Sequence, residues 1–184
     1  MSSFKRIAVS NRHLCPGSLQ EQAVRLEGRA DILILREKDL EEAAYRKLAE
    51  QMIPVCKRSG IRLICHTFRN AAEAAGCWSI HLTFDDFIQW ENRPGTFTCV
   101  GVSVHTLEEA LQAEKKGAQY VIASNIFETD CKKGLPGKGT AFLREICEKT
   151  HIEVYGLGGI TDKNEPLIRA CGADGACRMS DYMK

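Results

Sequence analysis

Short apolar segments alternate with longer amphipathic segments along the whole chain. The apolar segments are rich in Ile, Val, Leu, Cys or Ala, and each has about the length of one strand. Such runs are typical of strands that are buried on both faces of a parallel sheet. The pattern predicts strands at Arg6–Ser10, Ile32–Arg36, Arg62–His66, Ser79–Thr83, Phe97–Ser103, Tyr120–Ser124, Ile152–Gly156 and Gly175–Ser180.

The segments between these strands show helical spacing. Leu40–Lys57 repeats apolar residues three or four positions apart, as an amphipathic helix does. Thr106–Lys116 starts with Thr106 three positions before Glu109, which predicts a capping box, and stops before Gly117. Further helices are predicted at Asn70–Ala75, Asp86–Glu91, Ala141–Lys149 and Asn164–Ala170.

This alternation predicts an α/β protein, and eight strands are the number that closes a (β/α)8 TIM barrel. We expect one domain over residues 1–184, with the last helix missing or truncated because only four residues follow Ser180. A partner subunit, as in a homo-oligomer, could cover the apolar surface left there. An open doubly wound sheet is the alternative, although no Gly-x-Gly-x-x-Gly follows the first strand.

Composition excludes several classes of protein. The formal net charge is +1 and no basic run is interleaved with aromatic residues, so no nucleic-acid surface is expected. The apolar runs are too short to span a membrane, and the N-terminus lacks the pattern of a signal peptide, which favours a cytoplasmic location. The nine cysteines include no Cys-x-x-Cys pair, so most are interpreted as buried apolar residues.

In a TIM barrel the active site forms at the carboxyl ends of the strands. Gly158 and Gly159 follow the seventh predicted strand, and Met179 and Ser180 end the eighth. Glycines let backbone amides approach an anion, so this pair of segments predicts a phosphate site. The alternative is that the glycines only form a tight turn.

Two further segments could carry chemistry. His105, close to Ser103, lies just past a strand, and a histidine there can transfer protons near neutral pH. It could equally be an exposed turn residue before the Thr106 cap. The polar loop Ile126–Gly139 has the length of a lid or binding loop, or of a simple surface loop.

Several motifs together resemble the thiamine phosphate synthase family. They are Leu35-Arg36-Glu37-Lys38-Asp39-Leu40, Gly101–His105, Phe127–Lys132, Gly158–Ile160 and Gly172–Gly175, in the family's order from about residue 30 to residue 180. The resemblance implies a TIM barrel of thiamine biosynthesis, with two main branches. The synthase joins a pyrimidine diphosphate to a thiazole phosphate with Mg²⁺. The tautomerase aromatises a thiazole carboxylate phosphate by proton transfer, without a metal.

Departures from the synthase pattern separate the branches. Where the synthase carries Asn-Asp after the third strand, this chain has His66-Thr67, and only Asp86 matches a metal carboxylate. One carboxylate is a poor Mg²⁺–diphosphate site. Ile34 replaces a glutamine and Cys131 replaces the second loop threonine of the synthase. The segments around His105 and Cys131 resemble the tautomerase branch, in which the matching histidine is the proposed acid/base.

The sequence therefore favours a thiazole tautomerase that needs no cofactor and takes a small thiazole phosphate as its partner, with His105 as the catalytic residue. The resemblance and the loop positions predict that Gly158, Gly159, Met179 and Ser180 bind the substrate phosphate, and that Arg36, Lys38, Ser103, Thr129 and Lys132 bind the rest of the substrate. A Mg²⁺-dependent thiamine phosphate synthase, using Asp86, is the alternative, and a non-catalytic binding relative is the third hypothesis. A metal cluster of His66, His81 and Asp85 or Asp86 has no diagnostic spacing.

Overall fold

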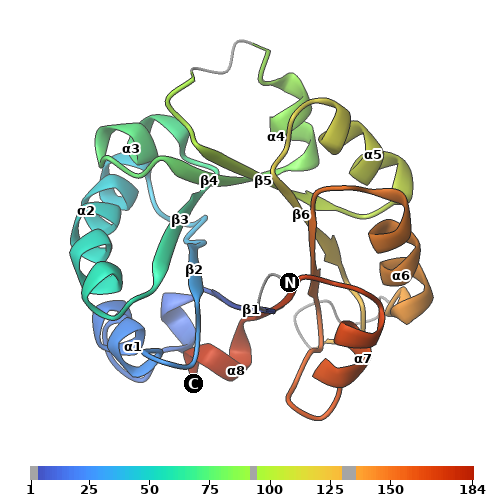
Figure 1. The fold of residues 1–184 in the computed structure, drawn as a ribbon. Coiled ribbons are helices and arrows are strands. Elements are labelled where there is room, and N and C mark those ends of the chain that lie inside the picture. The colour runs from blue at the N-terminus through green and yellow to red at the C-terminus, as the bar shows by residue number, and fades with distance from the viewer. Residues whose placement is uncertain (1–3, 92–94, 130–135) are drawn as a thin grey trace. The chain divides into compact units, whose positions relative to one another are not determined.

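The fold is an eight-stranded closed barrel in which the strands follow one another in chain order from β1 to β8. The computed structural model describes residues 4–91, 95–129 and 136–184. Every strand pair of defined register is parallel, and helices alternate with strands along the chain (Figure 1). The predicted (β/α)8 TIM-barrel fold is confirmed. Among the described residues, no helix combines the length and apolar character needed to cross a membrane.

The observed strands lie close to the predicted ones. β3, β4 and β6 match at both ends, whereas β5 begins two residues later than predicted and β8 ends two residues earlier. The strands are β1 Lys5–Val9, β2 Ile32–Leu35, β3 Arg62–His66, β4 Ser79–Thr83, β5 Cys99–Val104, β6 Tyr120–Ser124, β7 Glu153–Leu157 and β8 Gly175–Arg178.

The helices include one that the apolar pattern missed. α1 begins after Ser18, whose side chain accepts from the Glu21 amide while the Glu21 side chain accepts from the Ser18 amide, a complete capping box. The last helix, α8, has only four residues, which fits the truncation that was predicted. The helices are the 3₁₀ turn η1 Arg12–Leu14 and α1 Leu19–Arg25, α2 Glu42–Arg58, α3 Arg69–Ala74, α4 Phe84–Gln89, α5 Leu107–Lys115, α6 Gly139–Lys149, α7 Glu165–Ala170 and α8 Ser180–Met183.

The chain forms two compact units, each of which is described by itself. The N-terminal unit comprises Arg6–His81, Asn92–Val100 and Met179–Lys184, and the C-terminal unit comprises Met1–Lys5, Leu82–Glu91 and Gly101–Arg178. The expectation of one domain stays a prediction.

In the N-terminal unit, a buried tyrosine of α2 connects the ends of two strands. The hydroxyl of Tyr45 donates to the Leu35 carbonyl at 2.6 Å and accepts from the His66 amide at 2.8 Å. Tyr45 is completely buried, so its hydroxyl needs such partners. α2 also packs against α1, α3 and β3. This packing fixes the positions at which the chain leaves β2 and β3.

In the C-terminal unit, a glycine makes room for an aromatic ring. Gly101 of β5 lies opposite Tyr120 of β6, and a Cβ atom at position 101 would come within 1.9 Å of the Tyr120 ring. Tyr120 in turn contacts Tyr155 of β7, with ring centroids 5.1 Å apart. The glycine of the Gly101–His105 motif is therefore required for packing.

Most of the described cysteines are buried free thiols, as predicted. Cys56, Cys65, Cys77, Cys99, Cys171 and Cys177 are buried, and Cys15 and Cys147 are half-buried. Cys131 lies outside the described residues.

Candidate functional site

The carboxyl end of β2 is organised around a buried glutamate. The Glu37 carboxylate accepts from the Ser10 hydroxyl at 2.6 Å and from the Arg12 guanidinium at 3.0 Å, and only 2% of Glu37 is exposed. Ser10 also accepts from the Arg36 amide at 2.8 Å. The Glu37 carboxylate and the Arg36 amide are thereby held in place, which fixes the backbone from which the Arg36 side chain extends.

Two histidines meet at the carboxyl ends of β3 and β4. His66 and His81 pair in the strand register and their ring centroids lie 5.5 Å apart. Both are buried. Burial lowers the pKa of His66 well below its usual value, with smaller contributions from the charges of His81, Lys38 and Arg36. Burial, followed by Lys38 and Arg36, lowers the pKa of His81 to about 3. Both rings are therefore neutral at pH 7.

Thr67 holds this pair in an unusual backbone conformation. Its φ angle is 67°, a left-handed value that is strained for a β-branched residue. The Thr67 amide donates to the His81 carbonyl at 3.1 Å, and its hydroxyl lies 2.5 Å from Nδ1 of His66. Strain that is held by the surrounding hydrogen bonds is often found at functional sites.

These residues do not fit a Mg²⁺ site. Mg²⁺ prefers carboxylate, phosphate and water oxygens. Thr67 stands where the synthase pattern has its aspartate, and the preceding residue is the buried His66, whose pKa is lowered well below its usual value. Asp86 is occupied within α4, where its carboxylate accepts from the Thr83 hydroxyl at 2.6 Å. Among the described residues, no three His, Cys, Asp or Glu side chains gather as possible metal ligands. The hypothesis of a cluster of His66, His81 and Asp85 or Asp86 is therefore wrong for the described part of the chain.

His105 leaves β5 with its ring oriented by the neighbouring strand. Its Nδ1 lies 2.9 Å from the Ser124 carbonyl oxygen at the end of β6. A carbonyl oxygen can only accept, so Nδ1 must carry the proton in this contact. In the neutral ring, Nε2 then carries the lone pair. The residue is exposed, so that this nitrogen can reach a ligand as a base.

The backbone of His105 is held from two further elements. The Glu109 carboxylate of α5 accepts from the His105 amide at 2.6 Å, and the Lys138 ammonium donates to the His105 carbonyl. Thr106 caps α5 by accepting from the Glu109 amide at 3.1 Å. The predicted capping box is thus only half correct, because the Glu109 side chain binds the amide of His105 and not that of Thr106.

Gly158 and Gly159 pack tightly against the loop that follows β6. A Cβ atom would come within 2.7 Å of Asn125 Cβ from position 158, and within 2.4 Å of the Glu128 carbonyl from position 159. Their φ angles of 112° and 61° also favour glycine. Yet their amide N–H groups donate no hydrogen bond to another described residue. The glycines form a tight turn, and the same turn leaves two amides available for an anion.

The end of β8 holds the loop that follows these glycines. The buried Arg178 guanidinium donates to Asp162 at 2.7 Å and to Glu165 at 2.5 Å. Removing the charge of a buried, paired arginine leaves its carboxylate partners without a counter-charge and is strongly destabilising. Arg178 therefore fixes the chain between Gly159 and α7.

The remaining predicted residues are distributed between the two units. Met179 and Ser180 are half-buried at the start of α8 and belong to the N-terminal unit, whereas Gly158 and Gly159 belong to the C-terminal unit. That all four residues form one phosphate site therefore stays a prediction. Ser103 is half-buried in β5, opposite Ile122. Thr129 is half-buried in the loop after β6, and Lys132 lies outside the described residues.

Sequence reasoning assigned no role to three residues that position the candidate site. Glu37 stands between Arg36 and Lys38 in a motif that was noticed, but nothing in the pattern indicated that its carboxylate would be buried. Ser124 and Lys138 reach His105 through the fold, at separations of 19 and 33 residues. The capping box of Ser18 and Glu21 is a sequence signal for the start of α1 and bears on that helix only.

Comparison with known proteins gives a consistent set of relatives. The family described as thiamine monophosphate synthase matches residues 7–181. A thiamine-phosphate synthase of Shouchella clausii is 31% identical, covering 100% of this chain and 90% of the relative. One of Chlorobium phaeovibrioides is 34% identical over 94% of this chain and 83% of the relative. The solved thiamine phosphate pyrophosphorylase of Pyrococcus furiosus superimposes with a TM-score of 0.82 at 27% identity, covering 97% of this chain and 87% of that one.

Proposed function

The chain belongs to the thiamine monophosphate synthase family, and from this premise we propose that it is an enzyme of thiamine biosynthesis that acts on a thiazole phosphate as a tautomerase. The observation that carries the proposal is the orientation of His105. A contact of 2.9 Å between Nδ1 and the Ser124 carbonyl leaves Nε2 as the basic nitrogen on an exposed side chain.

This geometry suits the movement of a proton between two carbons. Nε2 removes a proton from a carbon of the non-aromatic ring, and the electron pair moves into the conjugated system. The imidazolium, held by the Ser124 carbonyl, then returns a proton at the other end of that system. Atoms and charge balance, and the product is the aromatic isomer. General acid–base catalysis of this kind typically contributes roughly 10²–10⁴-fold.

The other predicted residues receive roles in binding. The amides of Gly158 and Gly159, together with Met179 and Ser180, would hold the substrate phosphate. Arg36 and Lys132 would pair with its carboxylate, with Lys38, Ser103 and Thr129 as further contacts. Support comes from the amides of Gly158 and Gly159, which donate to no other described residue, and from the hydrogen bond of the Arg36 amide to Ser10 at the end of β2.

Thiamine phosphate synthase is the second candidate, and the names of the relatives favour it over the tautomerase. Arg36, Lys38, Asp86, Thr129 and Lys132 are compatible with it. Against it stands the poor fit of neutral His66 and hydrogen-bonded Asp86 to Mg²⁺. A relative that binds thiazole or thiamine phosphate without turnover is the third candidate.

Replacement of the histidine tests the proposal. His105→Ala should lower tautomerase turnover by roughly 10²-fold or more, because the base is lost while the exposed position keeps the fold intact. His151→Ala, which removes another exposed histidine of the same unit, should leave turnover unchanged. Equal turnover of the His105→Ala variant and the wild type would remove His105 as the catalyst.

A further inference from the structure

A cavity of about 390 Å³ lies in the N-terminal unit, at the amino ends of β3 and β4. Its wall includes Lys57 at the end of α2, Arg62 at the start of β3, and Trp78 and Ser79 where β4 begins. This volume falls within the usual range of small-molecule sites, about 300–1,000 Å³. His66 ends the same strand that Arg62 begins, roughly 13 Å away along an extended strand. The cavity is therefore separate from the residues assigned to the candidate site.

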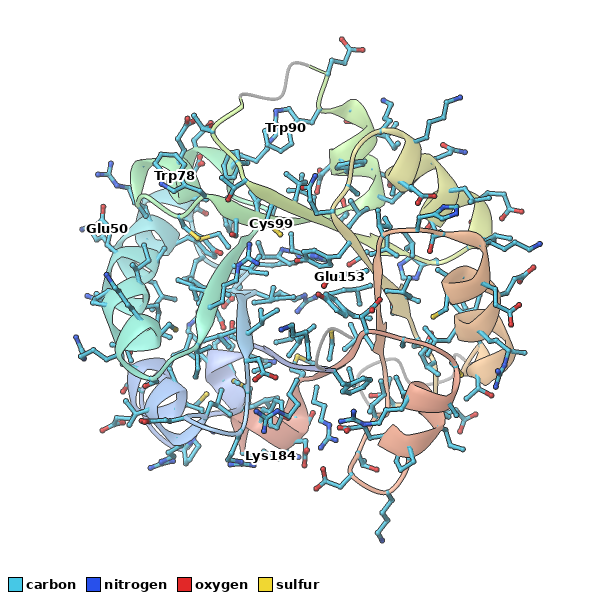
Figure 2. The ribbon with its side chains drawn as sticks, viewed as in Figure 1. Glu50, Trp78, Trp90, Cys99, Glu153 and Lys184 are labelled. Carbon is cyan, nitrogen blue, oxygen red and sulfur yellow. The ribbon has the colours of Figure 1, made fainter. Side chains whose placement is uncertain are left out.

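Trp78 gives the cavity an aromatic wall that reaches solvent. Trp78 (Figure 2) is 43% exposed, and among the described residues it is the only aromatic residue that is exposed. Its carbonyl accepts from the Thr98 amide at 2.9 Å and from the Thr98 hydroxyl at 3.2 Å. These bonds fix the backbone from which the indole extends, while the indole contacts no aromatic ring or cation of the described chain. Its face is thus available to pack against a flat ligand.

Neither cation of the cavity wall pairs with a described carboxylate. Lys57 and Arg62 form no ion pair within the part of the chain that the structure describes, and the described lining residues include no Asp or Glu. The neighbouring Asp31, whose carbonyl accepts from the Arg62 amide, has its carboxylate paired with Arg6 at 3.1 Å. The Arg62 guanidinium instead donates to the Ser79 hydroxyl at 2.9 Å, which holds it at the wall.

Three carbonyl oxygens of the wall already accept from protein donors. The Cys77 thiol donates to the carbonyls of Leu63 and Ser79, at 3.7 and 3.5 Å, and Thr98 donates twice to that of Trp78. A cationic ligand would therefore meet occupied carbonyls and no carboxylate among the described lining residues. An anionic ligand would meet an ammonium and a guanidinium, which are the donors that pair with carboxylates and phosphates.

We propose that this cavity is a binding site for a small aromatic anion, whose ring packs on Trp78 and whose anionic group pairs with Lys57 and Arg62. The aromatic wall selects a flat body, and the two cations select its charge. None of these residues takes part in the proposed tautomerase chemistry, so a test of the cavity does not depend on the proposed function.

The test follows the indole N–H signal of Trp78 by NMR in the ¹⁵N-labelled full chain, with the signal assigned by its absence in Trp78→Phe. 1-Naphthoate carries the ring and the negative charge, 1-naphthylmethylamine carries the same ring with a positive charge, and acetate carries the anionic group alone. Naphthoate should shift the Trp78 signal saturably, the amine should bind roughly tenfold more weakly or worse, and acetate should leave the signal unmoved. Trp90, the other tryptophan, is the internal control and should not respond. A Trp78 signal that naphthoate does not move, or equal affinity for the amine, would overturn the site.

Charge variants test the pairing with the anionic group. Lys57→Gln and Arg62→Gln should each weaken naphthoate binding by roughly two- to fivefold, as expected for the loss of one exposed ion pair. Arg58→Gln is the matched control, because it removes an exposed cation next to Lys57 that is not part of the cavity wall, and it should leave the affinity unchanged. Lys57 is exposed, so its replacement keeps the fold even if Arg62→Gln, which also loses the bond to Ser79, does not. Equal affinities of Lys57→Gln and Arg58→Gln for naphthoate would contradict the pairing.

Discussion

At the scale of single residues, the environment decides the chemistry of each histidine. His105 is exposed and has one nitrogen bound to a carbonyl oxygen, whereas His66 and His81 are buried beside one another and near two cations. The sequence alone identified these histidines and predicted that they lie at or just after the ends of strands. The difference in burial was not predictable, because it depends on residues of other elements, such as Tyr45 of α2 and His81 of β4, that lie against His66 in the fold.

The buried histidines should make the protein sensitive to acid. His81 has a folded-state pKa of about 3, whereas the unfolded chain binds the proton near pH 6.5. Between these values the unfolded state holds more protons, so the free energy of unfolding should fall as the pH falls, by up to about 1.4 kcal/mol per pH unit for this histidine. The stability that neutral His81 contributes is complete above about pH 6.5.

Denaturant unfolding at several pH values from 7 to 4 measures this slope. His81→Gln cannot take up the proton, so its unfolding free energy should depend less steeply on pH than that of the wild type. His151→Gln, at an exposed position, should keep the wild-type slope. Parallel curves for His81→Gln and the wild type would show that His81 is not kept neutral by burial.

At the scale of elements, local sequence signals located most helices and strands, and contacts between elements set their ends. The Thr106 cap was found because its signal lies within four residues, yet the Glu109 side chain binds His105 instead of completing the box. The glycine motifs had two interpretations, a turn or an anion site, and packing against Asn125 and Glu128 now explains the absence of side chains there. This contact could not be read from the sequence, because Asn125 and Glu128 come close to the glycines only in the folded chain.

Gly101 offers a direct test of packing between β5 and β6. Gly101→Ala should lower the free energy of unfolding by about 1–3 kcal/mol, the usual cost of overpacking, because the new methyl group would overlap the Tyr120 ring. Gly95→Ala is the control, since nothing lies within 4 Å of a Cβ atom at that exposed position. The comparison needs only urea unfolding curves. A Gly101→Ala variant as stable as the control would mean that the Tyr120 ring moves freely.

At the scale of the whole molecule, the barrel was predictable because eight buried strands, most of them separated by helical segments, admit few folds. Family membership was also legible, since several motifs recur in register and the family match spans residues 7–181. The reaction is the harder inference, because both branches share the barrel and most of the site residues. The distinction between tautomerase and synthase depends on two features. His66-Thr67 replaces the Asn-Asp of the synthase pattern, and the His105 ring is oriented by the Ser124 carbonyl.

The most direct test of the central claim is an NMR time course of the wild-type protein with the non-aromatic thiazole carboxylate phosphate, in D₂O with a chelator present. We predict accelerated formation of the aromatic isomer, with deuterium incorporated from solvent and with no further acceleration on adding Mg²⁺. The account would be contradicted if the isomer formed no faster than without protein while the same sample, given a pyrimidine diphosphate and Mg²⁺, produced thiamine phosphate.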